Sequence, residues 1–212
     1  MTDIRAQYLS AARTALGLLE SDAVAKAWGE PSALDKFTVG GLATHFAGQI
    51  TAVPDALDAD HAGKEVIGLF AHFDRATWVA ADIDNPANSR IRTGSESESA
   101  EGHGAVAAAA RSALDRLEAD LPGADGTAPA GTPRWAYATT LDDYLATRLL
   151  ELVVHADDLA YSTGVDTPAF DQDVFDTAAQ ILARLAAKRH GQPALIRALA
   201  RAERAPATIS GL

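Results

Sequence analysis

The chain has 212 residues, enough for one compact domain with a full core, or for one domain with a short extension, and too few for two ordinary domains. Hydrophobic residues make up 48% of it but aromatic residues only 6%, so its apolar content is mostly small and helix-forming. Its 18 Lys and Arg against 29 Asp and Glu give a net charge of −11, which repels phosphate backbones and anionic lipid. We therefore expect packed helices, and neither nucleic acid nor a membrane surface as a partner.

The sequence contains no cysteine, so the chain forms no disulfide and any thiol chemistry requires a thiol from outside. Residues 1–10 lack the basic and then apolar pattern of a secretion signal. No uncharged stretch approaches the ~18 residues that a membrane span requires. We therefore expect a cytoplasmic protein.

The first half of the sequence predicts three helices. Ile4–Leu19 has amphipathic spacing, and a further turn extends toward Trp28. Thr38 is a suitable N-cap for a second helix, which we expect Pro54 to kink or stop. We expect a third helix over residues 65–82.

The second half predicts one long helix and several shorter elements. The expected elements are a loop over 84–104, a helix over 105–121, a mobile linker over 122–133, a long helix over 140–162, and helices over 173–189 and 193–204. The long helix should end at Gly164, because glycine is common just after a helix C-terminus.

The long helix carries a stripe of polar residues. Its members are Arg148, Glu151, His155 and Asp158. Their spacings of 3, 4 and 3 residues place them within an arc of roughly 80° at about 100° per residue. The stripe could face solvent, with Arg148–Glu151 and His155–Asp158 ion pairs. Alternatively, Glu151 and His155 could hold one metal ion together with a ligand from another helix. The spacing alone leaves both interpretations open.

Six histidines could supply such a ligand. Three of them, His61, His103 and His190, lie near glycine or at a helix end, and we expect structural or surface roles for them. His72 lies in an apolar segment, which is more typical of a hydrogen-bonded core histidine than of a metal ligand. His45 follows the adjacent glycines Gly40 and Gly41, which permit close approach of another backbone.

Two segments, 37–48 (FTVGGLATHFAG) and 151–164 (ELVVHADDLAYSTG), resemble the mycothiol-dependent maleylpyruvate isomerase family of the DinB-like superfamily. The resemblance implies an all-α fold, a DinB-like four-helix bundle, whose core binds a divalent metal ion. The ligands in that family are a histidine on the second helix and a Glu-x-x-x-His on the fourth. In this sequence they correspond to His45, Glu151 and His155. The resemblance also implies zinc as the metal, with nickel as the second choice.

The resemblance spans most of residues 1–164, and residues 196–201 resemble the tail of shorter members. We therefore predict a metal-binding bundle over 1–164 and a short helical C-terminal extension over 165–212, packed on the bundle. The isomerase continues into a larger α/β domain, whereas the 48 residues after Gly164 have a helical pattern.

Two imidazoles and one carboxylate leave a divalent ion with an open coordination position, as in catalytic zinc sites. The family resemblance implies that a low-molecular-weight thiol, mycothiol, binds there as a thiolate for transfer to, or isomerisation of, a small-molecule substrate. A bound water would instead support hydrolysis, and a third alternative is a non-catalytic metal- or ligand-binding protein. We expect Arg148 and Asp158 to orient the ligands, and Arg90 and Arg92 to bind an anionic substrate near the bundle mouth. The sequence leaves the choice between monomer and dimer open.

Overall fold

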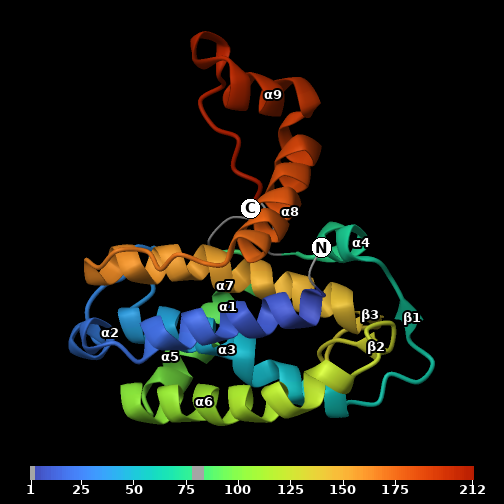
Figure 1. The fold of residues 1–212 in the computed structure, drawn as a ribbon. Helices are drawn as coiled ribbons and strands as arrows, with labels where there is room; N and C mark the ends of the chain where they lie inside the picture. Colours follow the sequence, from blue (N-terminus) through green and yellow to red (C-terminus); the bar gives the residue numbers. More distant parts are fainter. Residues whose placement is uncertain (1–2, 78–83) are drawn as a thin grey trace.

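The computed structural model describes residues 3–77 and 84–212. Four of its long helices form a bundle (Figure 1). They are α1 (Ile4–Leu19), α3 (Val39–Asp58), α6 (His103–Asp120) and α7 (Leu141–Thr163). α1 and α3 each pack against both α6 and α7, and a short helix, α2 (Asp22–Ala27), connects them. Apolar side chains such as Phe46, Leu117 and Leu150 fill the centre. The predicted all-α fold with a helical bundle is confirmed.

The start of α3 is fixed by close backbone contacts. The Thr38 hydroxyl accepts a hydrogen bond from the Gly41 N–H at 2.9 Å. Glu96, on the neighbouring helix, accepts hydrogen bonds from both the N–H and the hydroxyl of Thr38. A Cβ at Gly40 would lie 2.9 Å from the Trp28 carbonyl, and a Cβ at Gly41 would clash with the Glu96 carboxylate. The predicted close approach at the two glycines is therefore present.

α3 also continues past Pro54, so of the two expected effects of this proline, a kink or a stop, the stop is wrong. A proline inside a helix removes one backbone hydrogen bond. Burial of Val53 and Ala56, at 0% and 1% exposure, favours continuing the helix and offsets that loss.

The predicted third helix is wrong at its start and is shorter than expected in the described residues. Residues Glu65–Val66 form the strand β1, and only Leu69–Arg75 is helical, as α4. The end of the prediction, residues 78–82, lies outside the described residues. β1 pairs in parallel with β3 (Tyr137–Thr140), which pairs antiparallel with β2 (Pro129–Ala130). The strand pairing and Gly68, which precedes α4, prevent a continuous helix here.

Residues 84–104, expected to form a loop, contain the helix α5 (Pro86–Ser99). The Asn85 side chain accepts hydrogen bonds from the N–H groups of Ala87 and Asn88, and Pro86 occupies the first turn. α5 packs on α3 through polar residues such as Glu96, which explains why no apolar pattern indicated it. The expected linker over 122–133 contains a 3₁₀ turn, Leu121–Gly123, and β2, so it has regular structure after all.

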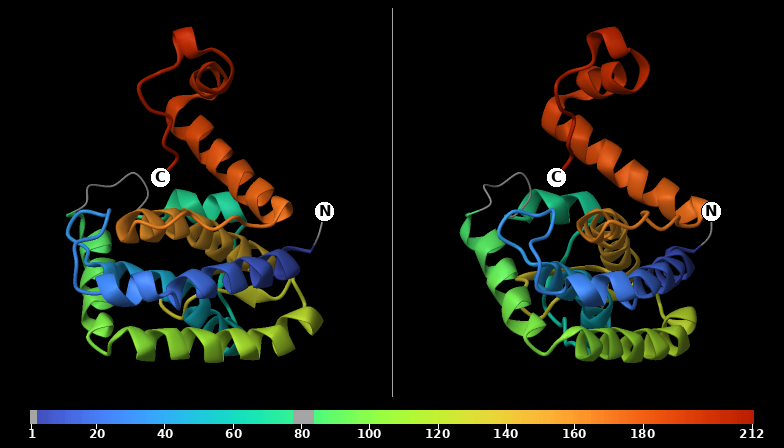
Figure 2. Two further views of the ribbon diagram at one scale, coloured as in Figure 1. Left: turned by 60° about the vertical axis from the view of Figure 1, so that its left-hand side comes forward. Right: turned by 90° about the vertical axis from the view of Figure 1, so that its left-hand side faces the viewer.

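α7 begins and ends as predicted. Thr140 caps its N-terminus, and Gly164 adopts the left-handed conformation at its C-terminus, with φ 69°. Two further helices follow, α8 (Gln172–His190) and α9 (Gln192–Ala200), and then a 3₁₀ turn, Ala202–Arg204. α8 begins against α1 and α7 and rises away from the bundle, with α9 at its far end (Figure 2). Among the described residues, no helix combines the length and hydrophobicity that a membrane span requires.

Candidate metal centre

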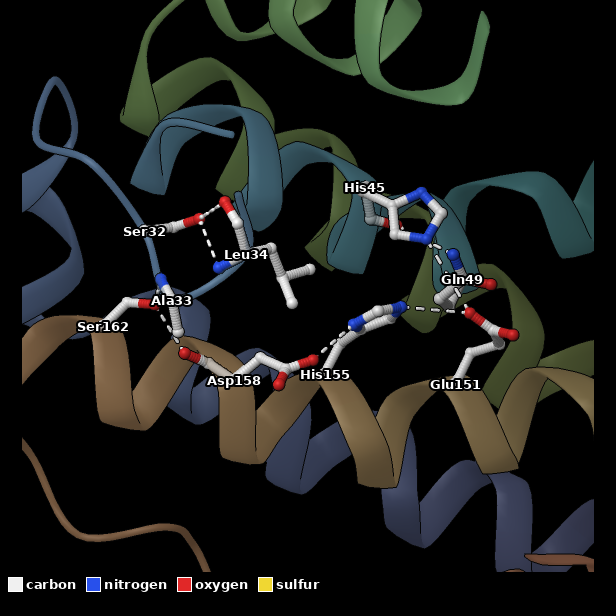
Figure 3. A network of polar contacts seen from close by, with 9 residues as sticks. All are labelled: Ser32, Ala33, Leu34, His45, Gln49, Glu151, His155, Asp158 and Ser162. Carbon is white, nitrogen blue, oxygen red and sulfur yellow. Dashed lines mark hydrogen bonds and ion pairs between the residues drawn. The ribbon is translucent and has the colours of Figure 1, made fainter. Parts of the chain in front are cut away.

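Three ligand-type side chains converge between α3 and α7. His45 projects from α3, and Glu151 and His155 project from α7 (Figure 3). The Glu151 Oε2 atom lies 3.1 Å from His155 Nε2 and 3.7 Å from His45 Nε2, and one ligand atom from each residue lies within 4.8 Å of the others. Tetrahedral zinc with bonds of about 2.0–2.1 Å separates its ligand atoms by about 3.3 Å. The three donors are therefore almost at coordination spacing.

The polar stripe of α7 faces the bundle interior. Glu151 is 8% exposed, and the side chains of His45 and His155 are 20% and 16% exposed. The alternative of a solvent-facing stripe is therefore wrong. The two imidazoles are more exposed than the carboxylate, whose side chain is 10% exposed.

Burial and hydrogen bonding have opposite effects on the pKa values of the three groups. Burial raises the pKa of Glu151, but hydrogen bonds with His155 and His45 outweigh it and hold that pKa well below its usual range. Burial lowers the pKa of His155, but its contacts with Asp158 and Glu151 raise the net value to about 9. Burial dominates at His45 and lowers its pKa. One imidazole is thus protonated and the other neutral at pH 7 when no metal is bound.

Asp158 orients one of the imidazoles. Its Oδ2 atom lies 2.9 Å from His155 Nδ1, so the opposite ring nitrogen, Nε2, is directed at Glu151. Such carboxylate–histidine pairs fix the ring orientation in metal sites. The backbone of Asp158 is also held, because Ser162 donates to its carbonyl at 2.6 Å and accepts a hydrogen bond from the Ala33 N–H (Figure 3). The loop before α3 therefore covers this end of the site.

Arg148 supports the other side through Gln49. Its Nη1 atom donates to Gln49 Oε1 at 2.6 Å, and Gln49 Nε2 donates to the His45 carbonyl at 2.9 Å. Arg148 also lies over the Tyr144 ring, 5.4 Å from its centroid. In place of the ion pair with Glu151 that the solvent-facing alternative predicted, Arg148 contacts Gln49, a residue that the sequence did not single out. The sequence does contain a signal for this residue: Gln49 follows His45 by four residues and so lies on the same face of α3.

The two arginines expected to bind substrate lie on α5 rather than on a loop. Arg90 is exposed, and Arg92 contacts Ser89 and Asp84. Lys36 also pairs with Asp84, so this region is a network of surface ion pairs. A substrate-binding role for Arg90 and Arg92 stays a prediction.

The remaining histidines have structural contacts, as expected. His61, His103 and His190 each place Nε2 within 3.2 Å of a backbone carbonyl oxygen. His72 is 2% exposed, its Nδ1 lies 3.1 Å from the Tyr137 hydroxyl, and burial lowers its pKa to about 4. It is a neutral core residue.

The fold and the convergent donors define a helical-bundle protein with a candidate divalent-metal centre. The donor set fits such an ion, because two imidazoles and one ionised carboxylate match zinc and nickel and leave a position for an exogenous ligand.

The comparison with protein families agrees with this class. The family model for the mycothiol maleylpyruvate isomerase N-terminal domain matches residues 9–160, from α1 to the last turns of α7, and the chain belongs to this family. No curated protein and no solved structure matches the chain. The helices α8 and α9 lie beyond the matched range.

Proposed function

We propose that the protein binds a divalent metal ion, zinc before nickel, through His45, Glu151 and His155, and is an enzyme that uses it to activate an exogenous thiol. The proposed thiol is mycothiol, and the reaction is transfer to, or isomerisation of, a small-molecule substrate in the cytoplasm. The observation that carries the proposal is the convergence of three metal-type donors within 4.8 Å in a member of a mycothiol-related family.

The absence of cysteine supports the use of an outside thiol, because the chain has no thiol nucleophile of its own. When bound, a divalent ion would stabilise the thiolate form of a thiol at neutral pH. The position left open by three protein ligands is where such a group would bind.

The residues of the chain have separate roles in this proposal. Glu151, ionised and buried, supplies the negative charge that holds the ion. Asp158 accepts the hydrogen bond from His155 Nδ1, which keeps Nε2 directed at the site and stabilises the protonated imidazole when the metal is absent. Arg148 and Gln49 hold the backbone of His45 and so the relative position of α3 and α7.

Cobalt substitution tests the thiol directly. Because the chain lacks cysteine, any thiolate-to-cobalt charge-transfer band must come from the added thiol. We expect this band when mycothiol is added to the cobalt-loaded protein, and none with S-methylated mycothiol. The Glu151→Gln variant should lose the band with the metal, whereas Glu118→Gln, a change of the same type on the surface, should keep it.

Other outcomes distinguish the alternatives. Bound cobalt without a thiolate band would contradict thiol activation. If such a preparation hydrolysed ester or amide substrates without thiol, the hydrolase alternative would replace it. If it neither bound thiol nor hydrolysed substrate, the metal would have a structural role only.

A further inference from the structure

The helices beyond the family match form an arm with an unusual surface. α8 rises from the bundle and α9 stands at its far end, as both views in Figure 2 show. α9 has no buried residue, and its Ile196 and Leu199 are 65% and 73% exposed. Seven large hydrophobic residues are markedly exposed in the described part of the chain, and five of them lie between residues 161 and 199. Apolar surface of this kind typically marks an interaction site.

The tip of the arm is basic. Residues 192–204, which form α9 and the 3₁₀ turn, contain three Arg against one acidic residue, Glu203, whereas the whole chain has a net charge of −11. A hollow in the tip has apolar walls that include Pro193 and Ile196, and three arginines, Arg197, Arg201 and Arg204, line it. No acidic residue lines this hollow, so it suits an acidic and partly apolar surface.

The base of the arm has the opposite charge to the tip. Residues 157–176, from the end of α7 to the start of α8, contain no Lys or Arg and six aspartates, of which Asp158 faces His155 in the metal centre. Exposed apolar residues lie among them: Tyr161, Val165 and Phe175 are 79%, 37% and 54% exposed. The base therefore offers the acidic and apolar surface that the tip lacks.

The basic tip and the acidic base of one arm cannot contact each other, because α8 lies between them. Its 19 residues span about 28 Å at 1.5 Å per residue. α8 is also anchored near its C-terminal end, where Arg184 lies 3.7 Å from the Phe70 ring centroid and Lys188 pairs with Asp74. The outward face of α8 carries Asp176, Gln180, Ala183 and Ala187, opposite the buried Val174, Ala178, Ile181 and Leu185. Its two alanines allow close approach of another helix.

We propose that this arm is a homodimer interface in which two α8 helices pack antiparallel. Across the two-fold axis, the basic tip of each chain lies on the acidic base of the other. A second copy of this chain is the partner because each chain carries both complementary surfaces. In a two-fold symmetric contact, each tip therefore meets the base of the other chain. A stable interface needs about 20–30 residues from each partner, which the base and arm together can supply. The strongly acidic base argues against nucleic acid or an anionic membrane at this surface.

Engineered cysteines test the geometry, because the natural chain has none. In the antiparallel arrangement Ala183 lies near the two-fold axis, so Ala183→Cys should form a disulfide-linked dimer on mild oxidation. Ala108→Cys, on the exposed face of α6, is the matched control and should remain monomeric on a non-reducing gel. Equal cross-linking of the two variants would mean random collision and would overturn the proposal.

Charge reversal tests the complementarity in solution. The pair Arg197→Glu and Arg201→Glu should raise the dimer dissociation constant by about tenfold or more, measured by sedimentation equilibrium. Adding Asp173→Lys and Asp176→Lys to that variant should restore part of the affinity. A wild-type chain that is monomeric at about 100 µM and low salt, where an interface of standard size is populated, would contradict the proposal. So would a monomer whose tip binds heparin, since that would indicate a polyanionic partner.

Discussion

Raising the pH from 7 to 9 should strengthen metal binding by about fiftyfold. Coordination requires neutral imidazoles, and the metal-free pKa of His155 is about 9. At pH 7 about 1% of this imidazole is neutral in the metal-free protein, against about one half at pH 9, so the affinity changes by about fiftyfold, or about 2.3 kcal/mol. His45 adds no such dependence in this range, because its pKa is lowered. The reference pKa of about 6.5 for both residues would instead predict one steep release near and below that pH.

Chelator-competition titrations with zinc between about pH 6 and pH 10 measure this dependence. Asp158→Asn weakens the hydrogen bond that raises the pKa of His155, so its affinity should level off at a lower pH than in the wild type. Asp157→Asn removes the same charge from the adjacent, exposed position and should follow the wild-type curve. A wild-type affinity that is constant between pH 7 and pH 9 would refute the reasoning, and so would identical curves for the two variants.

Two predictions concern stability in urea. His72 has its folded pKa lowered to about 4, so the unfolded chain binds its proton first and stability falls as the pH drops from about 6.5 to 4, by up to about 3 kcal/mol. His72→Gln should remove this part of the pH dependence, and an unchanged difference in stability between the two pH values would contradict the assignment. Gly41→Ala should destabilise the protein by about 1–3 kcal/mol, because the added Cβ displaces the Glu96 carboxylate from its hydrogen bonds with Thr38. Gly17→Ala, in a helix with open space around it, should stabilise it by about 0.4–1 kcal/mol, and the reverse order of the two variants would show that the contact is unimportant.

The sequence predicts the elements that have both an apolar period and a terminal signal. α7 has Thr140 at its start and Gly164 at its end, and its boundaries are within two residues of the prediction. α5 has a terminal signal, Asn85 before Pro86, but no apolar period, because its contact with α3 uses polar groups. The short strand β1 forms only because a distant segment, β3, pairs with it. Local pattern cannot reveal such a pairing.

In the candidate site, too, local spacing predicts contacts within one helix but not contacts between helices. Glu151 and His155 are four residues apart on one helix, so their spacing alone places them together. Their pairing with His45 came from the family resemblance, because a contact between two separate helices has no local signal. The hydrogen bonds through Gln49 and the covering loop at Ala33 are also tertiary contacts. They could not be found before the helices were positioned.

The metal content of the purified protein tests the central claim most directly. After incubation with zinc and removal of the free ion, elemental analysis should find about one zinc per chain in the wild type and in His190→Ala, whose imidazole contacts Ser210 far from the site. His45→Ala and His155→Ala should lose the ion while circular dichroism still reports folded helices, because apolar side chains form the core. A wild-type chain without stoichiometric zinc or nickel, or variants that retain as much metal as the wild type, would contradict the assignment of the metal centre.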